Sequence, residues 1–189
     1  MYHACFMLNI DLHCHSTISD GLLTPVQLIE RAASRGVTTM ALTDHDDIAG
    51  LAEARTAAEA KSITFINGVE ISVSWRGRTL HIVGLNIDPE YPPLVDGLAA
   101  IRAGRSQRAE NIAAELARIG IQGSLEGAYA HVGERRLIGR THFARFLVER
   151  GYAKDVKSVF KKYLVKGKPG YTSHEWATLS DTIGWICGS

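Results

Sequence analysis

The sequence predicts an α/β fold in which a parallel sheet is covered by helices and interrupted by a purely helical segment. Apolar, β-branched runs alternate with helical patterns through the first half of the chain, as in strand-helix-strand units. From about residue 98 the apolar residues recur at three- and four-residue steps without intervening strands. We therefore expect residues 1–97 and 171–189 to form one α/β portion and residues 98–170 to form a helical insertion.

The chain begins with a predicted strand-helix-strand unit. Residues 6–12 have the composition of a buried strand. Residues 24–27 supply an N-cap, a first-turn proline and a capping-box partner, so a helix is expected to start there and to end at Gly36. A second buried strand is predicted over residues 37–42.

A further helix and a hairpin follow in the prediction. Asp47 is expected to cap an alanine-rich helix that runs to about residue 61. Residues 63–66 form the third predicted strand, and a hairpin is expected over residues 73–85 with Gly77 in its turn.

The helical segment begins with a long amphipathic helix, predicted from Pro92 to about Ile119. Arg102, Arg105 and Arg108 repeat on another face of that helix, and single basic residues of this kind most often only solvate a helix surface. Three shorter helices are expected over residues 141–150, 155–164 and 178–187.

The net charge of +1 hides two oppositely charged segments. Residues 1–97 carry six Lys and Arg against twelve Asp and Glu, whereas residues 98–170 carry fifteen against six. An acidic segment collects cations and a basic segment collects anions, which is what a metal-dependent enzyme acting on a polyanion needs.

Several classes of protein are disfavoured by the composition. No stretch has the roughly 20 apolar residues that span a bilayer, and no secretory signal is evident, so a cytoplasmic protein without a membrane partner is expected. Nothing in the sequence indicates a protein partner. The cysteines at positions 5, 14 and 187 form no Cys-x-x-Cys, which argues against a disulfide framework and a thiolate zinc site.

Residue types that bind metals gather where the predicted strands end. Side chains alternate across a strand, so His13 and His15 point the same way and can hold one ion together. Imidazole and carboxylate ligands suit zinc, manganese or iron, and bridging carboxylates let two or three ions lie roughly 3.5–4 Å apart. The pattern therefore predicts a polynuclear metal site of the kind that hydrolyses phosphate esters.

Five motifs together resemble the PHP (polymerase and histidinol phosphatase) family of metallohydrolases. They are Asp11-Leu12-His13-Cys14-His15-Ser16, Ser19-Asp20-Gly21, Leu42-Thr43-Asp44-His45-Asp46, Asn67-Gly68-Val69-Glu70-Ile71-Ser72 and Leu80-His81-Ile82-Val83-Gly84-Leu85. The resemblance implies a distorted barrel of seven strand and helix units, incomplete in this chain, with an inserted helical subdomain and metals at the C-terminal ends of the strands. The implied metal ligands are His13, His15, Asp20, His45, Glu70 and His81. Glu70 is the expected bridging carboxylate.

Residues 138–145 and 166–171 further resemble a bacterial group within that family. Its members remove the 3′-phosphate of 3′,5′-nucleoside bisphosphates and trim short RNA from its 5′ end. The resemblance implies a nucleotide or short-RNA substrate and two or three divalent ions, manganese first and zinc or iron as alternatives. The residues expected to bind the second phosphate are Arg140 and His142, followed by Lys168 and Tyr171.

Asp44 has two interpretations. Beside the ligand His45, it can act in catalysis by accepting the second N–H of an imidazole and so orienting the ring. It can equally cap a helix or turn next to a strand end. Bound metal ions lower the pKa of water from about 15.7 toward about 7, so hydrolysis would need no Ser or Cys nucleophile.

The family pattern also implies ligands in a His-Pro pair and an Asp-x-His near its C-terminal end, and neither follows Gly170 in this sequence. We therefore expect the 189-residue chain alone to be weakly active or inactive.

Two alternatives to the bisphosphate and RNA hypothesis stay open. The same chemistry can act on histidinol phosphate or another small phosphomonoester, although the basic insertion argues against it. The chain can instead be a degenerate module that binds nucleic acid through residues 98–170, in which case binding weakens steeply with salt.

Overall fold

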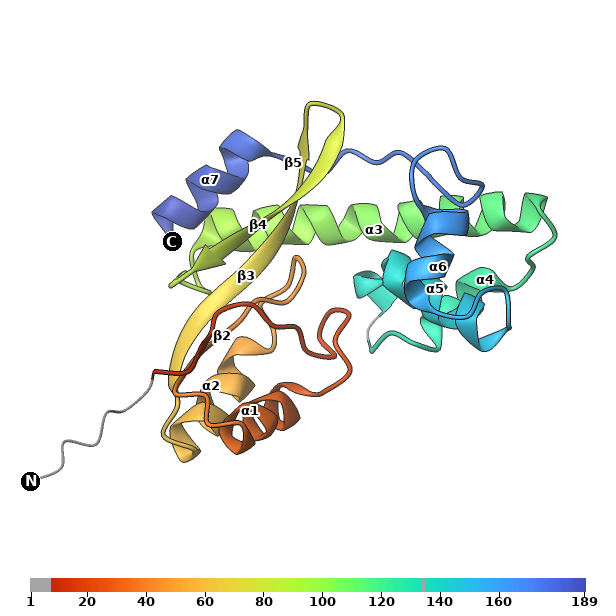
Figure 1. The fold of residues 1–189 in the computed structure, drawn as a ribbon. Coiled ribbons are helices and arrows are strands. Elements are labelled where there is room, and N and C mark those ends of the chain that lie inside the picture. Colours follow the sequence, from red (N-terminus) through yellow and green to blue (C-terminus); the bar gives the residue numbers. More distant parts are fainter. Residues whose placement is uncertain (1–7, 134) are drawn as a thin grey trace, which may run out of the picture.

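The computed structural model describes residues 8–133 and 135–189, and a five-stranded mixed sheet lies at one end of it (Figure 1). The strands are β1 (Ile10–Asp11), β2 (Thr39–Leu42), β3 (Thr64–Trp75), β4 (Arg78–Leu85) and β5 (Ala177–Thr178). β1, β2 and β3 pair in parallel, β5 is parallel to β3, and β4 is antiparallel to β3. The predicted α/β class is confirmed, and in the described part of the chain the sheet is open rather than closed into a barrel.

β3 connects the parts of the sheet. Its first four residues pair with β2, and the residues from Gly68 to Trp75 pair with β4. The third predicted strand and the first arm of the predicted hairpin are therefore one continuous strand. The reason is that Val69, Ile71 and Val73 alternate on it and are each 0% exposed, so the apolar face runs on without a break.

The hairpin between β3 and β4 is confirmed. Arg76 and Gly77 form its two-residue turn, with φ angles of +48° and +71°. Two central residues with positive φ match the right-handed twist of the flanking strands, and glycine adopts this conformation without a steric cost.

The edge strand β1 differs from its prediction. Of the predicted strand over residues 6–12, positions 6 and 7 lie outside the described residues. Ile10 is 51% exposed, so the expected burial is wrong for the part that is described. Among the described strands β1 pairs with β2 alone, which leaves its other edge open.

Two helices connect the parallel strands. In α1 (Pro25–Ser34) the predicted capping box is present: Thr24 Oγ1 accepts from the Gln27 N–H at 3.3 Å, and Gln27 Oε1 accepts from the Thr24 N–H at 3.0 Å. α2 (Leu51–Ala60) begins after Gly50, so the prediction that Asp47 caps it is wrong. The Asp47 carboxylate instead accepts from the Ala49 N–H and faces Arg102 at 3.5 Å.

The helical part is arranged along one long helix, α3 (Pro92–Arg118), as predicted (Figure 1). The other helices are α4 (Ser124–Tyr129), the 3₁₀ turn η1 (Arg135–Leu137), α5 (Arg140–Glu149), α6 (Val156–Val159), the π-helical turn η2 (Phe160–Leu164) and α7 (Leu179–Gly188). Leu94, Leu98 and Ile101 of α3 belong to the apolar cluster under the sheet. Ala109, Ile112 and Leu116 belong to a second cluster with α5 and η2. The division into an α/β portion and a helical insertion over residues 98–170 stays a prediction, because α3 contributes to both clusters and its Leu98 and Ile101 pack with the α/β portion.

The capping box of α1 yields a stability prediction. Thr24→Ala removes the side-chain acceptor for the Gln27 N–H and should lower the free energy of unfolding by about 1 kcal/mol. Urea denaturation should show a lower midpoint with an unchanged m-value. Thr56→Ala is the matched control, because Thr56 is exposed in the middle of α2 and its hydroxyl bonds only to the Ala52 carbonyl. Equal losses for both variants would contradict the capping role.

Candidate metal centre

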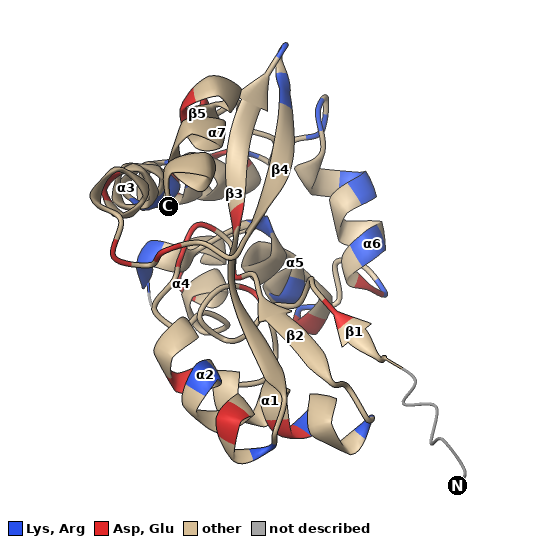
Figure 2. Cartoon of the chain, turned by 90° about the vertical axis from the view of Figure 1, so that its left-hand side faces the viewer, with Lys and Arg blue, Asp and Glu red and all other residues tan. Residues whose placement is uncertain are grey.

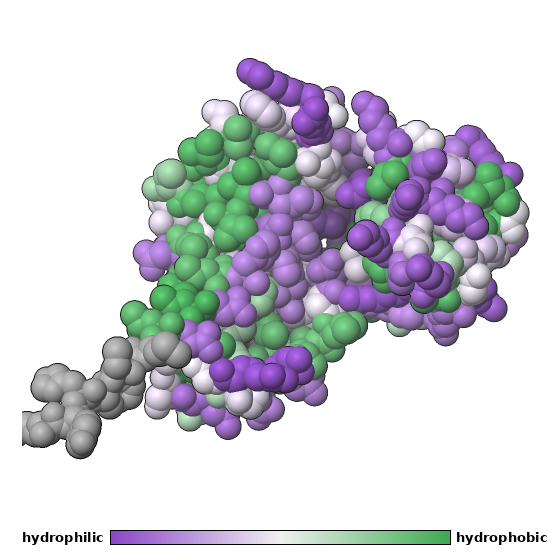
Figure 3. All heavy atoms as spheres, viewed as in Figure 1, coloured by the Kyte–Doolittle hydropathy of each residue, from purple (hydrophilic) through white to green (hydrophobic). Residues whose placement is uncertain are grey.

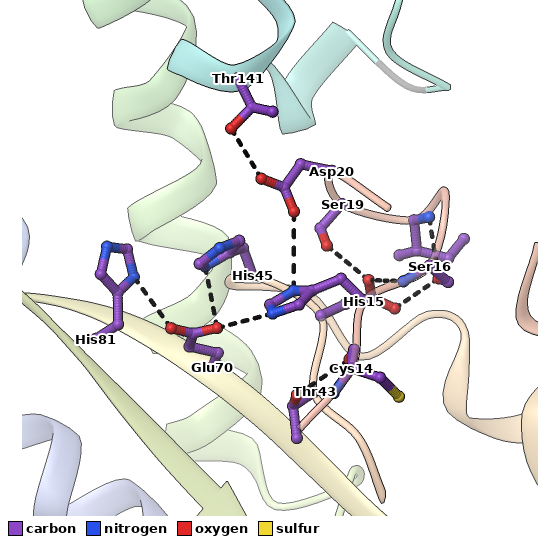
Figure 4. Close-up of polar contacts among 12 residues, drawn as sticks. Cys14, His15, Ser16, Ser19, Asp20, Thr43, His45, Glu70, His81 and Thr141 are labelled. Atoms are coloured by element: carbon purple, nitrogen blue, oxygen red, sulfur yellow. Dashed lines mark hydrogen bonds and ion pairs between the residues drawn. The ribbon is translucent and has the colours of Figure 1, made fainter. Parts of the chain in front are cut away.

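The six predicted ligands converge, and Figure 4 shows five of them. Four come from the segments that follow β1 and β2, whereas Glu70 lies within β3 and His81 within the antiparallel β4. Their ligand atoms form three groups, each within 4.8 Å. The groups are His13, His15 and Glu70; His15, Asp20 and His45; and His45, Glu70 and His81. His15, His45 and Glu70 each belong to two groups, so neighbouring groups share ligands.

Glu70 lies at the centre of the cluster. Its Oε2 is 2.8 Å from His13 Nε2 and 3.0 Å from His15 Nε2. Its Oε1 faces His81 Nδ1 at 3.6 Å. Burial raises the pKa of Glu70, but the hydrogen bond from His15 and the other imidazoles outweigh it and bring the pKa to about 2. The carboxylate is therefore ionised near neutral pH.

The imidazoles around Glu70 differ in pKa. Burial lowers the pKa of His81, whereas for His15 burial is outweighed by the carboxylates of Glu70 and Asp20, which raise its pKa. Burial lowers the pKa of His45 to about 4, so its ring is neutral and keeps a lone pair at neutral pH. The Nδ1 atoms of His15 and His45 are buried and have no hydrogen-bond partner among the described residues. Buried polar atoms normally have partners, and a divalent ion would use both lone pairs. The donor set of imidazole and carboxylate fits divalent metal ions.

Asp44 fixes the loop that carries Asp20. Its carboxylate accepts from the Ser16 N–H and the Ser16 hydroxyl, both at 2.7 Å, and from the Ser19 hydroxyl at 2.6 Å. These bonds match the turn-capping interpretation of Asp44. Within the described residues no imidazole is among its hydrogen-bond partners, so a role in orienting a ring stays a prediction.

Asp46 holds the other side of His45. Its carboxylate is 0% exposed, accepts from the Ser72 N–H at 2.6 Å and pairs with Arg105 of α3. The Asp46 N–H donates to the Glu70 carbonyl at 2.9 Å, which keeps His45 beside Glu70. The two aspartates that flank His45 thus join it to the 16–20 loop, to β3 and to α3.

The helical segment also reaches the cluster. Thr141 at the start of α5 donates to Asp20 Oδ2 at 2.9 Å, and Arg145 donates to the Asp20 carbonyl at 2.5 Å. Thr141 therefore positions a predicted ligand, a role that the sequence analysis missed. The adjacent Ile138-Gly139-Arg140 motif was the available signal for it.

A cavity of about 230 Å³ is shared by part of the ligand cluster and a group of arginines. Its lining includes the ligands Asp20, His45 and His81 and the arginines Arg105, Arg108 and Arg140. Arg105 is paired with Asp46. Among the described residues, no carboxylate lies within 4 Å of Arg108 or Arg140.

Arg108 and Arg140 are instead held against aromatic rings. Arg108 lies 5.0 Å from the centre of the Trp176 ring, and Arg140 lies 5.4 Å from that of Phe160. Burial and the neighbouring arginines lower the pKa of Arg108 to about 10, so the group remains charged at neutral pH. A buried cation without a counter-ion needs an anion from outside, so this wall of the cavity is suited to a phosphate.

The expectation of a solvated face is wrong for Arg105 and Arg108, which are 8% and 9% exposed. Trp176 covers both guanidinium groups. The spacing of arginines along α3 shows which of them share a face, but it does not show that a residue far along the chain, Trp176, covers that face.

The four predicted substrate-binding residues differ in placement. Arg140 and His142 line the small cavity. His142 is 1% exposed, its Nδ1 accepts from the Gly139 N–H, and burial lowers its pKa to about 4, so it is neutral. Tyr171 lines a second, larger cavity. Lys168 is exposed and is not among the residues that line either cavity.

Known proteins match this chain closely. A 3′,5′-nucleoside bisphosphate phosphatase of Chromobacterium violaceum is 55% identical over 183 residues, which are 97% of this chain and 64% of that protein. The 5′-3′ exoribonuclease Rnm of Escherichia coli is 46% identical over 178 residues, which are 93% of this chain and 60% of that protein. The chain thus spans less than two thirds of the length of these relatives.

Solved structures share the fold. An amidohydrolase from Chromobacterium violaceum, with bound sulfate and no metal, has a TM-score of 0.94 at 55% identity and covers 95% of this chain and 63% of its own. A candidate metal-dependent phosphoesterase of Bifidobacterium adolescentis has a TM-score of 0.88 at 29% identity and covers 96% of this chain and 64% of its own.

The family description that matches is the PHP domain, over residues 11–167. Since this match covers most of the chain and includes the whole ligand cluster, the chain belongs to the PHP domain family.

Proposed function

We propose that the protein is a metal-dependent phosphoesterase that removes the 3′-phosphate of 3′,5′-nucleoside bisphosphates and cleaves short RNA from its 5′ end. The observation that carries this proposal is that metal ligands and arginines without a carboxylate partner among the described residues line one cavity. The ligands Asp20, His45 and His81 line it together with the buried Arg108 and the half-buried Arg140. A substrate with two phosphates can contact both kinds of group, and the names of the relatives support this substrate class.

Two or three divalent ions would be held by the six-residue cluster. Glu70 offers an oxygen to two of the three ligand groups, which supports its role as the bridging carboxylate. When bound, such ions activate water and neutralise charge on the phosphate oxygens. Manganese is the first choice, and zinc or iron suits the same imidazole and carboxylate ligands.

Arg108 and Arg140 would bind the second phosphate. A guanidinium offers a planar fork of donors that matches phosphate oxygens, and both groups are already desolvated. The neutral ring of His142 would contribute a hydrogen bond at most, and the Tyr171 hydroxyl lies in the electrostatic reach of both arginines. This pocket favours a bisphosphate over histidinol phosphate or another substrate with a single phosphate.

No helix of the described residues is long and apolar enough to cross a membrane. As part of this proposal we place the protein in the cytoplasm, where nucleotides and short RNA are found.

The substrate choice is tested with the full-length protein and manganese. Adenosine 3′,5′-bisphosphate should release phosphate and leave adenosine 5′-phosphate. The kcat/KM for adenosine 3′-phosphate should be about 10- to 100-fold lower, because one charge-assisted contact of roughly 1.5–3 kcal/mol is missing. Rapid hydrolysis of histidinol phosphate without any release from the bisphosphate would refute the choice.

Glu70→Gln tests the metal centre. Loss of the shared negative charge should lower turnover about a thousandfold and reduce bound metal, measured by elemental analysis, while the melting temperature stays in the folded range. Glu59→Gln, an exposed residue of α2, is the matched control and should change neither quantity. If the chain is instead a degenerate binding module, salt-sensitive binding of an oligonucleotide is its only activity and Glu70→Gln leaves that binding unchanged.

Arg108→Gln tests the second phosphate site. The KM for adenosine 3′,5′-bisphosphate should rise about 10- to 100-fold, whereas the KM for adenosine 3′-phosphate should hardly change. Arg118→Gln removes an exposed arginine at the far end of α3 and should leave both values as in the wild type. An equal rise in KM for the two substrates in Arg108→Gln would mean that Arg108 does not bind the second phosphate.

A further inference from the structure

We propose that a second cavity, of about 810 Å³, binds the nucleotides of a single-stranded RNA that continue beyond the one at the metal centre. We call it the hairpin groove. It is lined by the turn of the β3-β4 hairpin on one side, by the 165–175 segment on the other and by Arg140. This inference rests on the proposed function, because it supposes that the substrate enters the metal centre.

The hairpin groove is continuous with the metal centre. Thr79 and Arg140 line both cavities. Thr79 lies two residues before the ligand His81 on β4, so their side chains are on the same face of the strand. The four residues from His81 to Gly77 cover roughly 13 Å, which leads from the cluster to the turn.

The charge of the hairpin groove suits a phosphate backbone. Arg76 and Arg78 are exposed at the turn, and Lys166 is exposed on the opposite side. Figure 2 shows blue at the tip of this hairpin and on the neighbouring loop. Glu175 is the one acidic residue among those that line the cavity. In the described residues no carboxylate lies within 4 Å of the two turn arginines or of Lys166.

The size and the aromatic groups favour single-stranded nucleic acid. Metal ligands and the buried arginines line the small cavity, which would hold the reacting nucleotide. The larger cavity therefore offers room for further nucleotides. Tyr171 is half-buried in the groove wall, and it lies within electrostatic reach of Arg140, which also lines the groove. Aromatic rings beside basic side chains are the usual surface for unpaired bases. Figure 3 shows hydrophilic atoms around the hollow between the two parts of the molecule.

The test compares a long and a short substrate in one double variant. Arg76→Gln with Arg78→Gln should lower kcat/KM for a 5′-phosphorylated pentaribonucleotide about tenfold, through KM. Hydrolysis of adenosine 3′,5′-bisphosphate should stay within about twofold, because neither arginine lines the small cavity. The matched control is Arg31→Gln with Arg35→Gln, an equal change of charge on the exposed surface at the end of α1, which should alter neither rate.

A binding measurement separates this inference from the proposed function. In the Glu70→Gln background, the slope of log K against log salt for the pentaribonucleotide should decrease by roughly 1.4 when both turn arginines are replaced, since each single-strand phosphate contact contributes about 0.7. If the wild-type protein releases no phosphate from the bisphosphate, the proposed function is wrong. The salt dependence of pentaribonucleotide binding still shows whether the hairpin groove contacts RNA. An unchanged slope would contradict the proposed role of the hairpin groove. Equal losses of kcat/KM for the long and the short substrate would contradict it as well.

Discussion

The site depends on one constraint, the burial of an ionised carboxylate among imidazoles. The Glu70 side chain is 7% exposed and faces ring nitrogens from β4 and from the segments after β1 and β2. A buried carboxylate is stable only where positive charge or hydrogen-bond donors compensate the lost hydration. The parallel pairing places β1 beside β2 and β2 beside β3, and the hairpin register sets Ser72 opposite His81. The sheet therefore supplies the partners of Glu70 from three segments.

Charged residues beside the cluster connect the two parts of the chain. Asp46 pairs with Arg105 of α3, and Asp20 accepts from Thr141 of α5. An acidic first half and a basic second half are therefore joined at the cavity itself. The helical segment helps to build the site and also shapes what can enter it, because Arg140 on the same helix lines both cavities.

The ligand cluster could be predicted from the sequence because its information is local. His13 and His15 lie two positions apart in one short motif, although β1 ends at Asp11 and its alternation does not extend to them. The capping signal at Thr24 fixes where the next helix starts. The role of Arg108 could not be predicted in this way. Its burial depends on Trp176, 68 positions later in the chain, and no periodicity within α3 encodes that contact. The same limit explains Asp47, whose carboxylate faces a distant arginine instead of capping α2.

The choice of arginine rather than lysine on the cavity wall follows from the same burial. Desolvation and the neighbouring arginines lower the pKa of Arg108 to about 10, and a guanidinium with that pKa is still fully charged at neutral pH. A lysine starts from a pKa about two units lower, so the same surroundings would leave its pKa much closer to neutral pH. A guanidinium therefore keeps its positive charge in this desolvated pocket with a larger margin than an ammonium group. Arg108 lines the same cavity of about 230 Å³ as Asp20, His45 and His81, so a phosphate held by its guanidinium keeps the rest of the nucleotide near these ligands.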